Sequence, residues 1–117
     1  MADSLEGLRE RLAAFAAARD WDQFHSPKNL SMALIAEAAE LVEHFQWLSE
    51  RQSHSLPEAK QQEVALELAD ILIYLIRTAD KLDIDLIAAA NQKITINESR
   101  YPADKVRGDA RRAEEYD

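Results

Sequence analysis

Apolar residues recur at three- and four-residue intervals over four stretches of the chain, a spacing that is typical of amphipathic helices. In the first stretch, residues 4–19, the repeat includes Leu5, Leu8 and Phe15. The other three predicted helices cover residues 28–52, 58–82 and 84–99. Four amphipathic helices with short connections predict an all-α fold, a four-helix bundle.

The last part of the chain differs in composition from the four helices. The stretch "YPADKVRGDARRAEEYD" is polar, highly charged and contains one of the two glycines. We therefore expect one domain over residues 1–102 and a charged C-terminal tail, residues 103–117, that is flexible or ordered by a partner.

Composition supports a single helical domain. A chain of 117 residues with 47% apolar side chains can bury one core, and two glycines leave few sites for tight turns. Without cysteine, neither a disulfide framework nor a thiolate metal site is available. The chain shows no secretory signal and no apolar run long enough for a membrane span, so we expect a cytoplasmic protein that does not bind membranes.

The net charge of −8 excludes one class of partner. Binding to a nucleic-acid polymer depends on Lys and Arg replacing counterions at the phosphates, so we expect no nucleic-acid polymer as a partner. A smaller phosphate compound would have to be attracted by something other than the surface charge. A divalent cation held by the protein would provide that attraction.

Two predicted helices each carry a pair of acidic residues three positions apart. The pairs are Glu37 with Glu40, in "EAAE", and Glu67 with Asp70, in "ELAD". Residues at this spacing are neighbours on a helix surface. The second pair interrupts one of the most apolar segments of the chain. If the two helices pack with these edges facing, four carboxylates converge on one point.

Four carboxylates in a partly buried space need a counter-charge. Arg77, Lys81 and Lys93 are the few basic residues near them in the sequence, which favours a metal. An all-oxygen ligand set suits Mg²⁺, with Mn²⁺ as the alternative, and Mg²⁺ in proteins commonly binds substrate phosphates as well. The ordinary alternative is that these acids are solvated surface residues, as most helical glutamates are.

Aromatic residues lie near the acidic pairs. Trp47 follows Glu40 by seven residues, and Tyr74 follows Glu67 by seven, so each lies two turns away on nearly the same helix face. Stacking a nucleobase on such a ring is worth roughly 1–3 kcal/mol. A nucleotide could therefore span from the acids to the aromatics, although core packing is the alternative for each ring. His25 could contact a base or a sugar, or could cap or pack.

The acidic pairs and several longer blocks resemble the MazG-like all-α nucleoside triphosphate pyrophosphohydrolases, whose motif is Glu-x-x-Glu followed by Glu-x-x-Asp. The blocks "RDWDQFHSPKNL", "AEAAELVEHFQW", "ELADILIYLI" and "NESRYP" are similar in sequence and order to those of the dCTP pyrophosphatase branch. The resemblance extends over about residues 5–102, and the tail is not matched.

The resemblance implies an enzyme that cleaves a nucleoside triphosphate between its α and β phosphates, most closely dCTP or a modified dCTP. It implies Mg²⁺ at Glu37, Glu40, Glu67 and Asp70 and assembly into dimers or tetramers. Glu40 is our choice for a general base, although the spacing does not assign it. The remaining implied nucleotide contacts are Trp21 and Trp47 around the base, and Lys93 and Asn97 on the last helix. The branch can carry a His where this chain has Leu12, so base recognition can differ in detail.

Other functions fit parts of the same pattern. A ferritin-like di-metal protein needs Glu-x-x-His, and none of the three histidines has Glu three residues before it. A non-enzymatic helical oligomerisation module would explain the apolar helices and leave the acidic motif to chance. Within the family, the alternatives are a hydrolase that prefers dUTP or non-canonical nucleotides, and the phosphoribosyl-ATP pyrophosphohydrolase of histidine synthesis, which the aromatic blocks disfavour.

Overall fold

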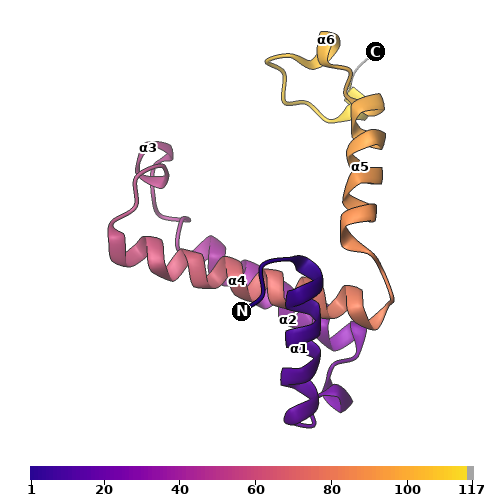
Figure 1. Cartoon of the computed structure of the whole chain (residues 1–117). Coiled ribbons are helices and arrows are strands. Elements are labelled where there is room, and N and C mark those ends of the chain that lie inside the picture. The colour runs from indigo at the N-terminus through magenta and orange to yellow at the C-terminus, as the bar shows by residue number, and fades with distance from the viewer. Residues whose placement is uncertain (116–117) are drawn as a thin grey trace. The chain divides into compact units, whose positions relative to one another are not determined.

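The computed structural model describes residues 1–115, and within them it contains helices and turns but no strand (Figure 1). In chain order the elements are α1 (Leu5–Ala18), η1 (Asp22–Phe24), α2 (Pro27–Glu43), α3 (Glu50–Ser53), α4 (Glu58–Lys81), α5 (Leu86–Arg100), α6 (Ala103–Val106) and η2 (Ala113–Glu115). The all-α class and the four principal helices predicted from the sequence are confirmed. Assembly into a dimer or tetramer stays a prediction.

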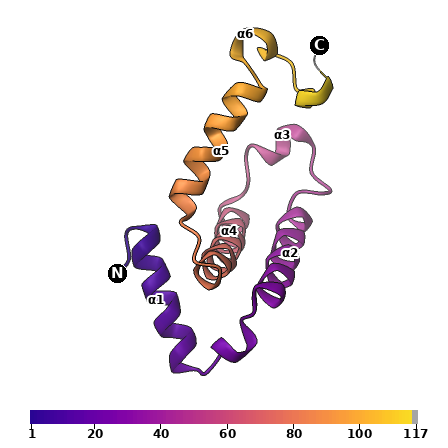
Figure 2. The same ribbon diagram turned by 90° about the vertical axis from the view of Figure 1, so that its right-hand side faces the viewer.

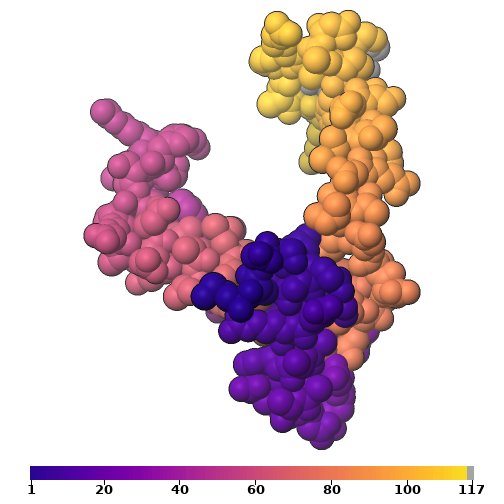
Figure 3. Space-filling view, viewed as in Figure 1, coloured from indigo at the N-terminus to yellow at the C-terminus, as the bar shows by residue number. Residues whose placement is uncertain are grey.

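The chain divides into two compact units, of which the first covers residues 1–84. In this unit α2 and α4 run side by side in opposite directions (Figure 2). The helix α1 packs across α4, and the space-filling view shows it lying over that helix (Figure 3). The small core is formed by Ala16, Leu30, Val64, Ile76 and Ala79.

Side-chain caps start three of the four long helices. Ser4, Ser26 and Asp85 each accept a hydrogen bond from the backbone N–H three residues on, at 3.0–3.1 Å. Such caps satisfy N–H groups that have no partner inside the helix. Pro27 follows Ser26 at the first helical position, where its missing N–H has no cost. The caps explain why the observed helix starts lie within about two residues of the predicted ones.

The helices α1 and α4 end with the same backbone geometry, which was not predicted from the sequence. Asp20 and Asp83, each two residues beyond its helix, have left-handed backbones with φ of 54° and 55°. In both cases the next residue donates its N–H to a carbonyl five positions back, Trp21 to Ala16 at 2.9 Å and Ile84 to Ala79 at 2.9 Å. This is the Schellman motif, with aspartate where glycine is usual.

The predicted second helix, residues 28–52, is wrong beyond Glu43. The chain leaves α2 at His44, passes through turns, and starts the short helix α3 at a capping box. In that box Gln52 donates its N–H to Ser49 Oγ at 3.1 Å, and Ser49 donates its N–H to Gln52 Oε1 at 2.9 Å. Apolar residues continue past the end of α2 at three- and four-residue intervals, and for this reason the helix predicted from the sequence is too long. In the structure, the cap at Ser49 starts a new helix.

The second unit begins at Asp85 and contains α5, α6 and η2. Beyond α5, the backbone N–H of Ala113 donates to the Tyr101 hydroxyl at 3.1 Å, and Arg100 pairs with Glu114 at 3.5 Å. The segment predicted as a tail therefore contains helical turns that contact the end of α5. The domain limit at residue 102 and the flexibility of the tail stay predictions. Among residues 1–115, no helix combines the length and the apolar character that crossing a membrane requires.

Candidate metal and nucleotide site

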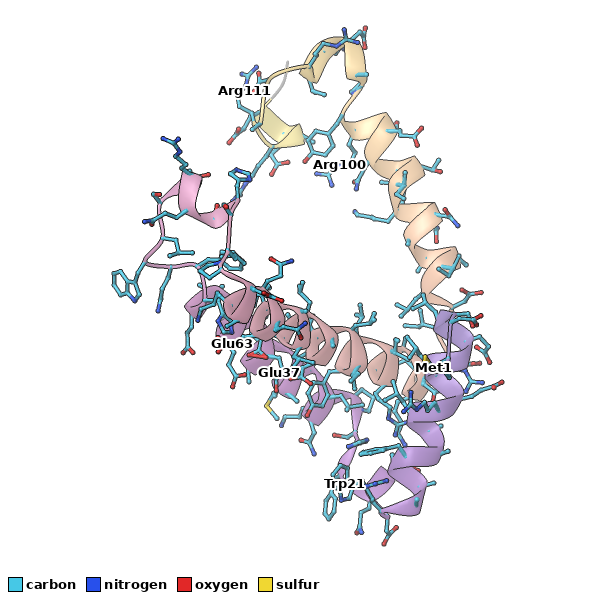
Figure 4. The ribbon with its side chains drawn as sticks, turned by 60° about the vertical axis from the view of Figure 1, so that its left-hand side comes forward. Met1, Trp21, Glu37, Glu63, Arg100 and Arg111 are labelled. Atoms are coloured by element: carbon cyan, nitrogen blue, oxygen red, sulfur yellow. The ribbon has the colours of Figure 1, made fainter. Side chains whose placement is uncertain are left out.

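The packing of α2 against α4 brings the two acidic pairs together. We use the name acidic cluster for Glu37, Glu40, Glu67 and Asp70. Carboxylate oxygens of Glu37, Glu67 and Asp70 all lie within 4.8 Å of one another, and Glu40 interacts with both Glu37 and Glu67. Figure 4 shows Glu37 where α2 runs beside α4.

Glu67 is the most buried member of the acidic cluster, with 9% of its surface exposed. Its hydrogen bond with Glu40 and its burial, followed by Glu37, raise the pKa of Glu67 to about 7. The pKa of Glu40 is lowered in turn by its hydrogen bonds with Glu67 and Glu37. The cluster therefore keeps a proton that an isolated glutamate would lose, because several anions cannot share this space unaided.

The surroundings of Glu37 show that a metal ion would fit at the acidic cluster. Burial, followed by the neighbouring Glu40, raises the pKa of Glu37. Its Oε2 atom is buried and has no hydrogen-bond donor among the described residues. A buried acceptor without a donor is costly, and a cation at that point would satisfy it. The donor set of carboxylate oxygens is the one that hard divalent cations prefer.

The basic residues nearest to the acidic cluster form ion pairs with carboxylates outside it. Glu63, one turn before Glu67, pairs with Lys60 at 3.0 Å, and His44 Nδ1 lies 3.9 Å from the same carboxylate. The Lys60 ammonium lowers the pKa of Glu63. Arg77 and Lys81 both pair with Asp22, at 2.7 and 2.8 Å. Within residues 1–115, no ion pair involves a member of the acidic cluster, and His44 acts on Glu40 only as a minor charge that helps to lower its pKa.

Two of the aromatic candidates lie together at the other end of α1 from Met1, where Figure 4 labels Trp21. The rings of Trp21 and His25 have centroids 6.3 Å apart, and Trp21 also packs edge-on against Phe15 at 5.7 Å. Trp21 is 43% exposed, so a flat ligand can still reach its ring. We call residues 21–25 the aromatic turn.

Arg77 is a residue of this region whose role the sequence did not reveal. Only 4% of it is exposed, and its Nη2 donates to Asp22 Oδ1 and to His25 Nδ1, at 2.7 and 3.2 Å. Nη1 donates to Asp80 Oδ2 at 3.4 Å. From the helix periodicity Arg77 lies beside the carboxylates of α4, and nothing in the sequence shows that it reaches a turn 52–55 residues away.

The other candidates are not brought to the same point by the described contacts. Trp47 is 87% exposed in the turns after α2, and Tyr74 is half-buried on α4 between Asp70 and Arg77. Lys93 and Asn97 lie on α5, in the second unit. The nucleotide contacts of these four residues stay predictions.

The chain matches the model of the MazG-like family over residues 33–115, a range that includes the whole acidic cluster. It belongs to that family, and the membership predicted from its motifs is confirmed. The crystal structure of a pyrophosphatase from Archaeoglobus fulgidus DSM 4304 has the same fold. The two chains are 38% identical with a TM-score of 0.80, over 87% of this chain and 95% of the archaeal one.

Curated relatives point to one branch of the family. The chain is 42% identical to dCTP pyrophosphatase 1 of Homo sapiens over 93% of its own length, and 43% identical to that of Bos taurus over 92%. It spans 65% of the human protein and 64% of the bovine protein.

Proposed function

We propose that this chain is a metal-dependent nucleoside triphosphate pyrophosphohydrolase that cleaves the α–β phosphoanhydride, releasing a nucleoside monophosphate and pyrophosphate. The proposal depends above all on the convergence of Glu37, Glu67 and Asp70 within 4.8 Å without a basic partner. The names of the mammalian and archaeal relatives support a pyrophosphatase, and the mammalian names support dCTP, or a modified dCTP, as its substrate.

The acidic cluster would hold Mg²⁺, with Mn²⁺ as the alternative. A bound divalent cation supplies charge for the triphosphate and lowers the pKa of a bound water. The protein side chains supply the rest of the chemistry. Glu37, Glu67 and Asp70 converge as ligands, and their fixed positions on two packed helices orient the phosphates for in-line attack.

Glu40 is the proposed general base. It is more exposed than Glu37 and Glu67, and its lowered pKa keeps it ionised at neutral pH. An ionised carboxylate beside the ligands, open to solvent, can accept a proton from an attacking water at its oxygen. The other members of the cluster face one another and are less accessible to water.

The aromatic turn is the proposed base-binding region. Arg77, which contacts it, follows Asp70 by seven residues on α4, which corresponds to about 10 Å along the helix. An extended nucleotide can span that distance with its phosphates at the acidic cluster and its base near Trp21 and His25. Tyr74 lies on α4 between the two ends. Trp47, Lys93 and Asn97 complete the proposed contacts.

A homo-oligomer, a dimer or a tetramer, is part of the proposal. Leu68, Leu72 and Leu75 of α4 are exposed at helical spacing and form one apolar stripe, which Leu82 continues at the C-cap of the helix. None of the residues of α5 is buried, although Ile87 and Ile94 project from it. Exposed apolar helix faces of this kind are typical of interfaces between subunits. A cytoplasmic location stays a prediction from the sequence.

The experiment is a panel of canonical and modified triphosphates assayed with Mg²⁺, in which pyrophosphate and single phosphate are both measured. We expect pyrophosphate and the monophosphate as products, with dCTP or a 5-modified dCTP giving the highest kcat/KM. Single phosphate as the main product would reject the reaction, and a preference for dUTP or damaged nucleotides would reassign the base. A chain that binds Mg²⁺ but hydrolyses nothing would be the non-enzymatic oligomerisation module.

A further inference from the structure

We propose that Arg77 is a positioning residue for base recognition, which holds the aromatic turn against α4 and fixes His25 in the tautomer with its proton on Nε2. The inference rests on the proposed function for the identity of the ligand. The arrangement of the guanidinium, the turn and the imidazole stands on contacts of the described residues.

The guanidinium of Arg77 contacts three acidic or imidazole side chains from two parts of the first unit. Arg77 Nη2 carries two N–H groups, and the structure directs them to two acceptors, Asp22 Oδ1 at 2.7 Å and His25 Nδ1 at 3.2 Å. Nη1 reaches Asp80, whose carboxylate is also bound by Arg9 of α1 at 3.2 Å. One buried side chain of α4 therefore links both ends of the aromatic turn with the contact between α1 and α4.

The contact with Arg77 determines which ring nitrogen of His25 carries the proton. A guanidinium has only donors and stays protonated in proteins, so His25 Nδ1 must be the acceptor. The ring is then neutral, and its single N–H is at Nε2. Burial, followed by the charge of Arg77, lowers the pKa of His25, which agrees with a neutral ring. A neutral His25 offers a hydrogen-bond donor, which suits a ligand with an acceptor such as the carbonyl oxygen of a pyrimidine.

Arg77 does more than neutralise the charge of Asp22. Asp22 already has Lys81 at 2.8 Å, and the Lys81 ammonium is the largest cause of the lowered pKa of Asp22, ahead of Arg77. Neutralising Asp22 therefore does not require a second cation. The bond to His25 is the contact that Arg77 makes and Lys81 does not. Since the His25 ring packs beside Trp21, fixing one ring restrains the other.

The test compares Arg77→Met with Lys81→Met, which removes a cation from the same carboxylate without touching His25. In wild-type protein labelled with ¹⁵N-histidine, we expect the Nε2–H tautomer for His25 at pH 7.5, assigned by loss of its signals in His25→Gln. Arg77→Met should lose this single tautomer, whereas Lys81→Met should keep it. Both variants should bind Mg²⁺ like the wild type, because neither residue touches the acidic cluster.

Steady-state kinetics with dCTP give the second readout. We expect Arg77→Met to raise KM about tenfold, as for loss of one charge-assisted hydrogen bond, with kcat changed less than about threefold. Lys81→Met should change KM less than about threefold. An Nδ1–H or charged His25 in the wild type would overturn the inference, and so would equal KM changes in the two variants.

Failure of the proposed function is distinguishable from failure of this inference. If the wild-type protein hydrolyses no triphosphate, the proposed function is wrong, and the tautomer of His25 still decides the role of Arg77. If Arg77→Met does not fold, the wild-type spectrum alone decides, because an Nδ1–H tautomer is incompatible with an arginine donor at that atom.

Discussion

At the scale of single residues, the carboxylates of the acidic cluster differ because their surroundings differ. Glu67 is buried on α4 and shares a hydrogen bond with Glu40 of α2, so it keeps its proton to about pH 7. Glu63, one turn away on the same helix, faces Lys60 and stays ionised. The same residue type thus serves two purposes within four positions, and the neighbouring charge decides which.

Replacing Glu67 by glutamine should weaken metal binding and stabilise the metal-free protein. The amide removes the charge that burial and Glu40 oppose, so the melting temperature in EDTA should rise by a few degrees. Removing a side chain that hydrogen-bonds to a metal ligand typically lowers metal affinity by about 10–100-fold. Removing a ligand itself should lower the Mg²⁺ affinity by at least as much. Isothermal titration with Mg²⁺ and thermal melts check both.

The matched control is Glu43→Gln, on the exposed side of α2. It should leave Mg²⁺ affinity and the melting temperature unchanged within about 1 °C, as most surface substitutions do. A Glu67→Gln protein that binds Mg²⁺ as tightly as the wild type would contradict the metal assignment.

The stability of the metal-free protein should fall as pH rises from about 4.5 to 7. Folding raises the pKa of Glu67 to about 7, so across this window the folded state binds more protons than the unfolded state. Stability then decreases with pH, and the contribution is complete below the ordinary glutamate pKa and lost above the raised one. Melts in EDTA at several pH values measure this slope. Glu67→Gln should flatten it, and an equal slope in both proteins would refute the cause.

The residue pattern predicted part of this site. Two acidic pairs at a spacing of three were enough to expect convergence, and the structure brings Glu37, Glu67 and Asp70 together. The contacts of Arg77 could not be predicted from the sequence, because Asp22 and His25 are far away along the chain and lie on a turn without periodicity. Spacing identifies neighbours on one helix, whereas contacts between segments depend on how those segments pack.

At the scale of elements, the helix starts were predictable and the helix ends less so. Serine and aspartate caps give a local signal, and the observed starts follow it. The ends of α1 and α4 use Asp20 and Asp83 in left-handed conformations, where the usual glycine is absent. The break after Glu43 was missed because its apolar spacing continues through the turns into Leu48. A pattern of apolar residues cannot tell a turn from a helix when the turn continues the same spacing.

Asp83→Gly should stabilise the fold by about 0.5–1 kcal/mol, because glycine adopts a positive φ without the steric cost of a β-carbon. Asp83→Ala is the matched control, since it removes the same charge but keeps the β-carbon. It should give no gain. Urea unfolding of the three proteins compares their free energies of unfolding. A gain of equal size in both variants would assign the effect to charge and not to the backbone.

At the scale of the whole molecule, the described chain buries few large side chains. Leu30 is the one large residue with less than 2% of its surface exposed, while several leucines and isoleucines of α4 and α5 are open. A 117-residue chain with so much apolar surface exposed is expected to bury it in an assembly. The sequence predicted the helices and their apolar faces, but the number of subunits depends on surfaces that only a partner can define.

Charging the apolar stripe of α4 should dissociate the assembly. In Leu68→Asp/Leu75→Asp, two carboxylates replace leucines at an expected subunit contact, and their desolvation opposes association. We expect a lower mass in sedimentation equilibrium than for the wild type. Gln61→Glu/Gln62→Glu adds two charges to exposed positions of the same helix and should keep the wild-type mass. Equal masses for the stripe variant and the wild type would place the contact elsewhere.

The unequal exposure of the two indoles makes the protein its own optical probe. Trp47 is nearly as open as free indole, and Trp21 is partly covered by Phe15. These are the only tryptophans in the chain, so its emission is the sum of one long-wavelength and one shorter-wavelength fluorophore. A nucleotide that stacks on one of the two indole rings should quench the fluorescence emission of that ring. Single Trp→Phe replacements would then show which ring the ligand covers, without a label or a coupled assay.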